Sequence, residues 1–186
     1  MPNVPASTIE PVTTAEFSSF VEYLNDHLSD NGVGGQYFLP LHRDSRRVPP
    51  AIESSFQVGI DTPVGGAGWR RVWVARSSEG QIVGHVDLRC RPERFAAHRC
   101  VLGMGVHRDH RRLGLGAALL SYAEQWALDV AGLEWIDLDV LSANESAIRL
   151  YLRAGFIKIG EVPDMFMIDG RAHAYTTMTK KLARPA

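Results

Sequence analysis

A short segment that combines arginines with glycines offers the clearest chemistry in the sequence. It runs from Val106, where an apolar stretch ends, to Ala117, and it contains Arg108, Arg111, Arg112, Gly114 and Gly116. Apolar residues at helical spacing follow it, and the N-terminus of a helix offers unpaired N–H groups and a positive dipole end. Glycine lacks a Cβ atom and lets a ligand approach the backbone. The segment therefore predicts a phosphate-binding turn between a strand and a helix.

The turn lacks residues that the better-known phosphate-binding motifs require. A Walker A loop is excluded because no Gly-Lys-Ser/Thr occurs, and Leu119 stands where a dinucleotide fingerprint needs its third glycine. Glu134 lies about where a ribose-binding acid would stand, so a nicotinamide-cofactor enzyme stays an alternative. The simplest alternative is a basic surface loop whose glycines only help the chain to turn.

A second pattern follows downstream, in Asn144-x-x-Ala147-x-x-x-Tyr151-x-x-x-Gly155-Phe156. The turn pattern Arg111-x-x-Gly114-x-Gly116 precedes it, after a predicted strand. Together these patterns resemble the GCN5-related N-acetyltransferase (GNAT) superfamily, over roughly Trp69 to Leu182. The part before Trp69 resembles the family only in outline, as a strand, a helix and a variable segment.

The resemblance implies acetyl-coenzyme A as co-substrate and assigns residues to it. The pyrophosphate role falls, mostly through backbone N–H groups, on Arg111, Arg112, Leu113, Gly114, Leu115, Gly116 and Ala117. The pantetheine arm would bond the backbone of Met104, Gly105 and Val106 and the side chain of Asn144. One N–H of that strand would polarise the thioester carbonyl as an oxyanion donor. For Asn144, a plain helix cap is the competing interpretation.

Two residues are assigned to proton transfer. Tyr151 matches the family tyrosine near the coenzyme sulfur, where a phenol can protonate the departing thiolate; the alternative is a core aromatic residue. Asp139 matches a position where relatives often carry a glutamate base, and its shorter side chain suggests a water relay. A polar residue on the wetter face of a strand is the competing interpretation for Asp139. The alternative bases are Asp87, His85, His98 and Asp137.

The elements that position these residues follow from periodicity and turn residues. Strands are predicted at Thr8–Val12, Val72–Ala75, Ile82–Arg89, Arg99–Val106, Trp135–Leu141, Phe156–Val162 and Ala174–Lys180. Helices are predicted from Ala15, over Ala51–Val58, from Gly114 to about Ala131, and from a capping box at Ser142–Glu145 to just before Gly155. This order predicts a single α/β (α+β) domain over residues 1–186.

The family resemblance makes the fold more specific. It implies a GNAT fold, with a mixed, mostly antiparallel sheet flanked by helices and a V-shaped splay after the fourth strand. Gly103 and Gly105 in that strand are compatible with the bulge that typically opens the splay. A hairpin centred near Phe95 would place Cys90 opposite Cys100, most simply as two reduced, apolar fillers.

The charge balance and the distribution of apolar residues indicate which kinds of partner and location to expect. The 20 basic and 21 acidic side chains give a net charge of −1, which does not favour binding to nucleic acid or a membrane surface. We find no apolar stretch of membrane-spanning length, no signal-peptide pattern and no histidine cluster for a metal. We expect a cytoplasmic protein without a metal and leave a homodimer open.

The resemblance, together with these residues, predicts an N-acetyltransferase. It would transfer acetyl from acetyl-coenzyme A to a primary amine of a small molecule or a peptide, by direct attack in a ternary complex. The alternatives are a non-catalytic acyl-coenzyme A-binding module and an acyltransferase for longer acyl groups. The irregular, Gly- and Pro-rich segment 29–68, and Tyr37–Arg43 within it, is expected to border the acceptor site.

Overall fold

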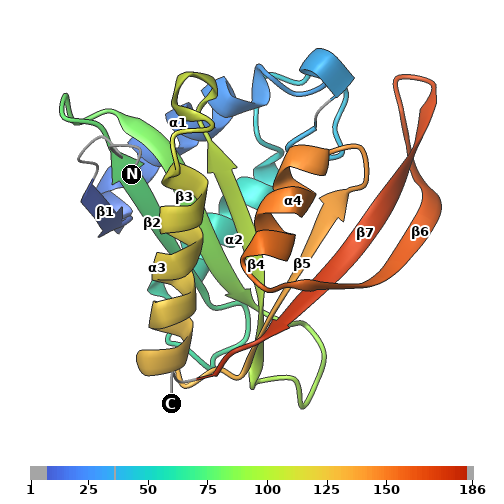
Figure 1. Ribbon diagram of the computed structural model, residues 1–186. Helices are drawn as coiled ribbons and strands as arrows, with labels where there is room; N and C mark the ends of the chain where they lie inside the picture. The colour runs from blue at the N-terminus through green and yellow to red at the C-terminus, as the bar shows by residue number, and fades with distance from the viewer. Residues whose placement is uncertain (1–7, 36, 184–186) are drawn as a thin grey trace.

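One mixed sheet organises the chain in the computed structural model, which describes residues 8–35 and 37–183 (Figure 1). Its seven strands lie in the order β1-β2-β3-β4-β5-β7-β6. The strands are β1 (Thr8–Pro11), β2 (Arg70–Arg76), β3 (Ile82–Cys90), β4 (Arg99–Val106), β5 (Trp135–Leu141), β6 (Ile157–Ile168) and β7 (Arg171–Lys181). The α-helices are α1 (Phe17–Leu28), α2 (Pro50–Asp61), α3 (Leu115–Asp129) and α4 (Glu145–Arg153).

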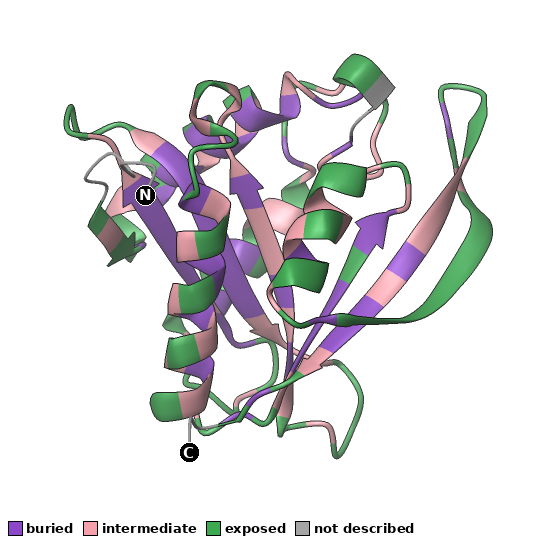
Figure 2. Ribbon diagram, in the orientation of Figure 1, coloured by how far each residue is buried: buried purple, intermediate pink, exposed green. Residues whose placement is uncertain are grey.

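The helices cover both faces of the sheet, and strand alternation in β2 separates two cores. Trp73 and Ala75 pack with α3 and α4, whereas Val72 and Val74 pack with α1 and α2. Figure 2 shows the buried residues concentrated in the central strands and on the inward faces of the helices. The β6–β7 hairpin extends beyond this layered body, and most of β6 is exposed.

The sheet opens between β4 and β5, its one parallel pair among the described strands. Their pairing covers only Arg99↔Trp135, Cys100↔Ile136 and Val101↔Asp137, after which the two strands diverge. This divergence confirms the predicted V-shaped splay. The bulge expected near Gly103 and Gly105 is absent from the β3–β4 pairing, whose register is continuous from Gly84↔Val106 to Cys90↔Cys100. The splay therefore comes from the separation of β4 from β5, without a register shift against β3.

The structure confirms the predicted placement of the two cysteines and corrects the predicted cap of α4. Cys90 does lie opposite Cys100, and both thiols are free. The capping box expected from Ser142 is wrong, because Asn144 is the N-cap and its Oδ1 accepts from Ala147 N at 3.3 Å. Ser142 instead continues the contact of β5 with β7, since its backbone N–H donates to the Ala174 carbonyl and its hydroxyl is hydrogen-bonded to that of Thr176.

Candidate active site

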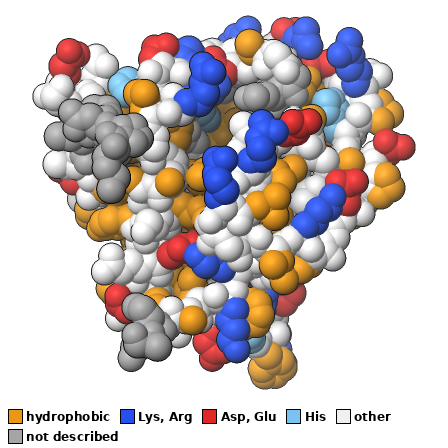
Figure 3. Space-filling view, in the orientation of Figure 1, with side chains coloured by type: hydrophobic (Ala, Val, Ile, Leu, Met, Phe, Trp, Pro, Cys, Tyr) orange, Lys and Arg blue, Asp and Glu red, His pale blue; other side chains and the backbone are white. Residues whose placement is uncertain are grey.

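A cavity of about 1100 Å³ occupies the open end of the splay. It is bordered by the ends of β4 and β5, the turn before α3, helix α4, and residues 37–40. On the face shown in Figure 3, Lys and Arg side chains gather beside the hollow between α4 and the start of α3. The structure thus brings the two sequence patterns to the same cavity.

The backbone of β4 presents hydrogen-bonding groups to this cavity. The N–H of His107 donates to Val83 on β3, so alternate peptide groups, those of Met104 and Val106, point away from β3 toward the splay. Pairing with β5 has already ended at Val101, and Arg111 Nε takes the Val106 carbonyl at 3.0 Å. The N–H groups of Met104 and Val106 and the Met104 carbonyl therefore fit an amide-bearing ligand such as a pantetheine arm.

The turn before α3 has the conformation that its glycines predict. Gly114 is the N-cap of α3 and adopts a left-handed φ of 88°. The first helical bond is made by Ala117 N, so the N–H groups of Leu115 and Gly116 precede the intrahelical ladder. A Cβ atom at Gly116 would lie 3.1 Å from Leu150 Cδ2 on α4, so this glycine also allows α3 and α4 to approach. These free N–H groups in the turn before α3 fit a phosphate group at the helix N-terminus.

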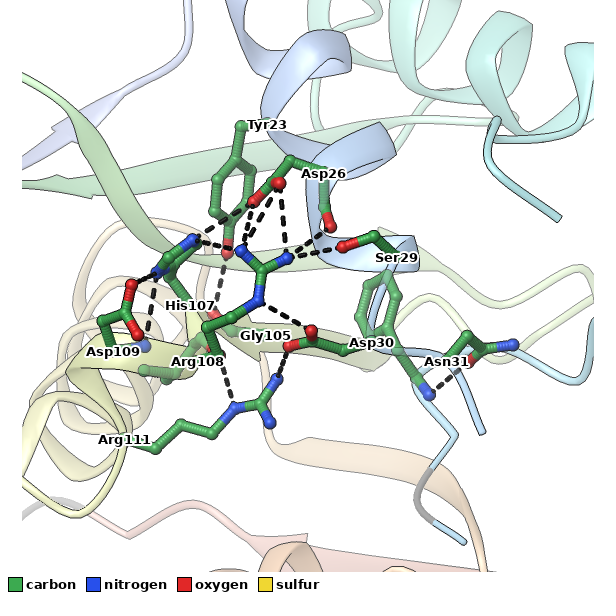
Figure 4. A network of polar contacts seen from close by, with 12 residues as sticks. Tyr23, Asp26, Ser29, Asp30, Asn31, Gly105, His107, Arg108, Asp109 and Arg111 are labelled. Carbon is green, nitrogen blue, oxygen red and sulfur yellow. Dashed lines mark hydrogen bonds and ion pairs between the residues drawn. The ribbon is translucent and has the colours of Figure 1, made fainter. Parts of the chain in front are cut away.

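The arginines of the turn differ from the sequence expectation. Arg108 and Arg111 are not free cations, because Arg108 forms ion pairs with Asp26 in the last turn of α1 and with Asp30 just after the helix, and Arg111 pairs with Asp30 (Figure 4). Arg112 lines the cavity and forms no ion pair with any residue that the structure describes. Backbone N–H groups, Arg112 and the Nη1 group of Arg111, which makes no hydrogen bond among the described residues, are thus the donors left for an anion in this turn.

Asn144 and Tyr151 both line the cavity from α4. Asn144 does so while capping the helix, so its two sequence interpretations are compatible. Tyr151 is 6% exposed, and burial raises its pKa, which keeps the phenol protonated near neutral pH. Its hydroxyl makes no hydrogen bond within residues 8–35 and 37–183. It is therefore free to donate to a ligand in the cavity.

Three assigned residues do not line the cavity. Leu115 is buried in the core beneath α3, and Leu113 is exposed beside the turn, so only their backbone could contact a ligand. Asp139 lies on an exposed part of β5, and its Oδ1 accepts from Thr177 Oγ1 at 2.6 Å. The cavity reaches β5 only at Val140 and Leu141, at the end of the strand, and Asp139 is bonded to Thr177 just before that end.

The alternative bases are also engaged or distant. The Asp87 carboxylate is buried against Arg70 at 3.2 Å, and the Asp137 carboxylate is bound by Arg91 and Arg99. His98 lies in the exposed loop before β4, at the closed end of the splay. None of these side chains lines the cavity among the described residues.

His27, which lies outside both sequence patterns, also lines the cavity. His27 of α1 lies so close to β4 that a Cβ atom on Gly105 would be 2.7 Å from its Nε2. Burial lowers the pKa of His27 to about 3, so the ring is neutral at pH 7. Behind it, the Tyr23 hydroxyl donates to the Gly105 carbonyl at 3.3 Å and contacts His85 Nδ1 at 3.2 Å. The signal was a histidine at helical spacing from Phe20 and Tyr23.

Comparisons with known proteins identify the class. A model of the acetyltransferase (GNAT) family matches residues 42–156, which is more than half of the chain. The chain therefore belongs to the GNAT family of acetyltransferases, the enzymes that use acetyl-coenzyme A as acetyl donor. Within the residues described, no group of His, Cys, Asp and Glu is suited to hold a metal ion. No helix in that part of the chain is long and apolar enough to cross a membrane.

Individual relatives are more distant. The N-terminal acetyltransferase A complex catalytic subunit NAA10 of Arabidopsis thaliana is 31% identical over 99 residues, 53% of this chain and 52% of that protein. The chain thus matches about half the length of that relative. The uncharacterized N-acetyltransferase YycN of Bacillus subtilis (strain 168) is 24% identical over 149 residues, 80% of this chain and 90% of YycN.

Solved structures share the fold. The putative acetyltransferase yncA of Salmonella typhimurium, solved with acetyl-coenzyme A, has a TM-score of 0.76 at 21% identity and covers 97% of this chain and 96% of its own. A putative phosphinothricin N-acetyltransferase has a TM-score of 0.77 at 16% identity, covering 96% of this chain and 100% of its own. Both likenesses confirm the predicted GNAT fold.

Proposed function

We propose that this protein transfers the acetyl group of acetyl-coenzyme A to a primary amine by direct attack in a ternary complex. The observation that carries the proposal is the splay itself. It leaves the N–H groups of Met104 and Val106, the glycine turn at the start of α3, and the Tyr151 phenol around one cavity. These are a holder for the pantetheine arm, a holder for the pyrophosphate and an acid for the thiolate.

Positioning and oxyanion stabilisation supply most of the acceleration in this proposal, because a thioester is already activated. The turn from Arg112 to Ala117 holds the pyrophosphate through N–H groups, and Asn144 contacts the pantetheine arm. A β4 N–H donates to the thioester oxygen as negative charge develops there. The C–N bond forms and the C–S bond of the thioester breaks, while Tyr151 donates its proton to the departing thiolate, whose pKa is about 8.5 when it is unperturbed. The proton lost by the amine nitrogen passes to water, from which Tyr151 is reprotonated.

The acceptor amine enters, in this proposal, beside residues 37–40. Tyr37, Phe38 and Tyr175 give that end of the cavity an aromatic lining, and the Phe38 ring meets His27 edge-on with a centroid distance of 4.4 Å. The neutral His27 ring, rather than Asp139, lies where it can accept a hydrogen bond from the attacking amine. This assignment keeps the sequence expectation that segment 29–68 borders the acceptor site.

The test is an amine screen that measures free thiol released from acetyl-coenzyme A. The panel holds a peptide N-terminus, the class named for NAA10; spermidine, the substrate class of a Vibrio cholerae N-acetyltransferase that shares this fold; and free lysine. Thiol release that requires one of these amines supports the proposal. Binding of coenzyme A by calorimetry, with no release for any amine, supports the non-catalytic module instead.

A second arm addresses the acyl group. Acetyl-, propionyl- and succinyl-coenzyme A are compared at equal concentration with the amine that the screen identifies. Faster turnover of a longer acyl group would favour the longer-chain alternative. The homodimer and the cytoplasmic location stay predictions of the sequence.

A further inference from the structure

The end of α1 is bound to the phosphate-binding turn by a compact set of ion pairs (Figure 4). Asp30 Oδ1 accepts from Arg108 Nε at 2.7 Å, and Asp30 Oδ2 accepts from Arg111 Nη2 at 2.8 Å. Each oxygen of one carboxylate is thus bonded to a different arginine of the turn. We call Asp30, Arg108 and Arg111 the Asp30 clamp.

Further bonds extend the clamp at both ends. Arg108 Nη2 donates to the Asp26 backbone carbonyl at 3.0 Å, at the C-terminal end of α1, where a helix dipole favours a cation. Arg111 Nε donates to the Val106 carbonyl at 3.0 Å, at the end of β4. Arg111 therefore joins α1 to the point where β4 leaves the sheet and the turn begins.

The charges of the clamp pair with one another and hold the turn in place. Its arginines are compensated by Asp26 and Asp30, so together they add no net positive charge to the cavity. Asp30 is only 18% exposed at its side chain, and charge-assisted hydrogen bonds of this kind are the stronger ones in proteins. Such a link fixes the backbone on both sides of the turn, at the border of the cavity that all three side chains line.

We propose that Asp30 is a positioning residue for coenzyme A binding: through Arg108 and Arg111 it holds the turn in the conformation that presents its N–H groups. The free turn then has less conformational freedom to lose when the pyrophosphate binds. This inference rests on the proposed function, in which the cavity binds acetyl-coenzyme A. It assigns a role in affinity to a residue that lies outside both sequence patterns.

The experiment measures the affinity for coenzyme A by calorimetry in Asp30→Asn, a substitution of nearly equal shape. We expect a loss of about tenfold, or about 1.4 kcal/mol. The kcat at saturating acetyl-coenzyme A should stay within about twofold of wild type, so the change appears in KM. Glu22→Gln is the matched control, because it removes the same charge from an exposed site on α1 that forms no ion pair in the described structure; its affinity should match wild type.

A double variant shows whether Asp30 acts through the clamp. In an Arg111→Gln background, Asp30→Asn should cost at most about threefold, because part of the link is already lost. A full, independent tenfold loss would overturn the proposal. Unchanged affinity in the single variant would overturn it too, and tighter binding would show that Asp30 withholds the arginines from the anion.

Two controls keep the outcomes separate. Wild-type protein that fails to bind coenzyme A would overturn the proposed function and the clamp together, whereas wild-type binding with an unaffected Asp30→Asn overturns the clamp alone. Should Asp30→Asn not fold, Arg108→Lys tests the same link, since lysine keeps the charge but lacks the planar fork that bonds Asp30 and the Asp26 carbonyl together. Unchanged affinity in Arg108→Lys would then contradict the proposal.

Discussion

At the scale of a single residue, Tyr151 combines a buried ring with a position in the lining of the cavity. Its side chain is 6% exposed and packs against Phe156, with ring centroids 5.7 Å apart. The ring is thus a core aromatic, while its hydroxyl stays available at the cavity. The two interpretations that the sequence left open are therefore compatible in one side chain.

Tyr151→Phe separates these two roles. Phenylalanine keeps the packing and removes the proton donor, so kcat should fall by about 10²–10⁴-fold, with the affinity for coenzyme A nearly unchanged. Stopped assays of thiol release and calorimetry measure the two quantities. Tyr122→Phe on α3 is the control, because Tyr122 undergoes the same chemical change outside the cavity lining. Equal rates in the two variants would return Tyr151 to a purely structural role.

Single residues also show which features of the site the sequence could predict and which it could not. The spacing around Tyr151 and Asn144 is local, and the structure places both at the cavity. Alternation predicted that Asp139 and Val140 point to opposite faces of β5, but not which residues of the strand border the cavity. The pairing of Arg108 and Arg111 with Asp30 joins residues about 80 positions apart in the chain, and no local pattern encodes such a contact.

At the scale of elements, the closed end of the splay depends on a buried acid. Asp137 ends the short β4–β5 pairing and accepts from Arg99 Nε and Arg91 Nη1, each at 2.9 Å, and from Thr179 of β7 at 2.6 Å. Burial alone would raise the pKa of Asp137, but the hydrogen bonds from Arg99 and Thr179 hold it below its usual range. The same carboxylate thus connects β4, β5 and β7 where the cavity ends.

Asp137→Asn should destabilise the protein by about 3 kcal/mol, because it leaves two arginines without their buried partner. The measurement is the free energy of unfolding in urea at pH 7. Asp139→Asn is a matched comparison on the same strand, and its exposed site should cost less than about 1 kcal/mol. Similar losses at the two positions would show that the Asp137 network does not hold the closed end.

Elements with strong periodicity were predictable, and their ends less so. The predicted strands Arg99–Val106 and Trp135–Leu141 coincide with β4 and β5. By contrast, β6 continues to Ile168, past the predicted end at Val162, because its pairing with β7 resumes after an irregularity between Val162 and Phe166. Pairing across an irregular ladder is a tertiary effect, and Pro163 gives a local signal against a strand.

At the scale of the whole molecule, two buried histidines join its N-terminal helix to its sheet. His27 of α1 and His85 of β3 are 4% and 1% exposed, and both pack around Tyr23. Burial lowers the pKa of His27 to about 3 and that of His85 to about 4, from an ordinary value of 6.5. Both rings are therefore neutral in the folded protein at pH 5, whereas in the unfolded chain they are protonated.

This difference predicts how stability depends on pH. A histidine with a lowered pKa contributes stability that is fully present above pH 6.5 and is lost as pH falls toward its folded pKa, because the unfolded state binds more protons. Between pH 7 and 5 the loss should be about 2 kcal/mol for each ring.

Urea unfolding at pH 7, 6 and 5 measures this loss of stability. His27→Phe should remove about half of the dependence, whereas His98→Gln, at an exposed site, should remove none. A His27→Phe variant that loses as much stability as wild type over this range would show that the ring is not held neutral by burial.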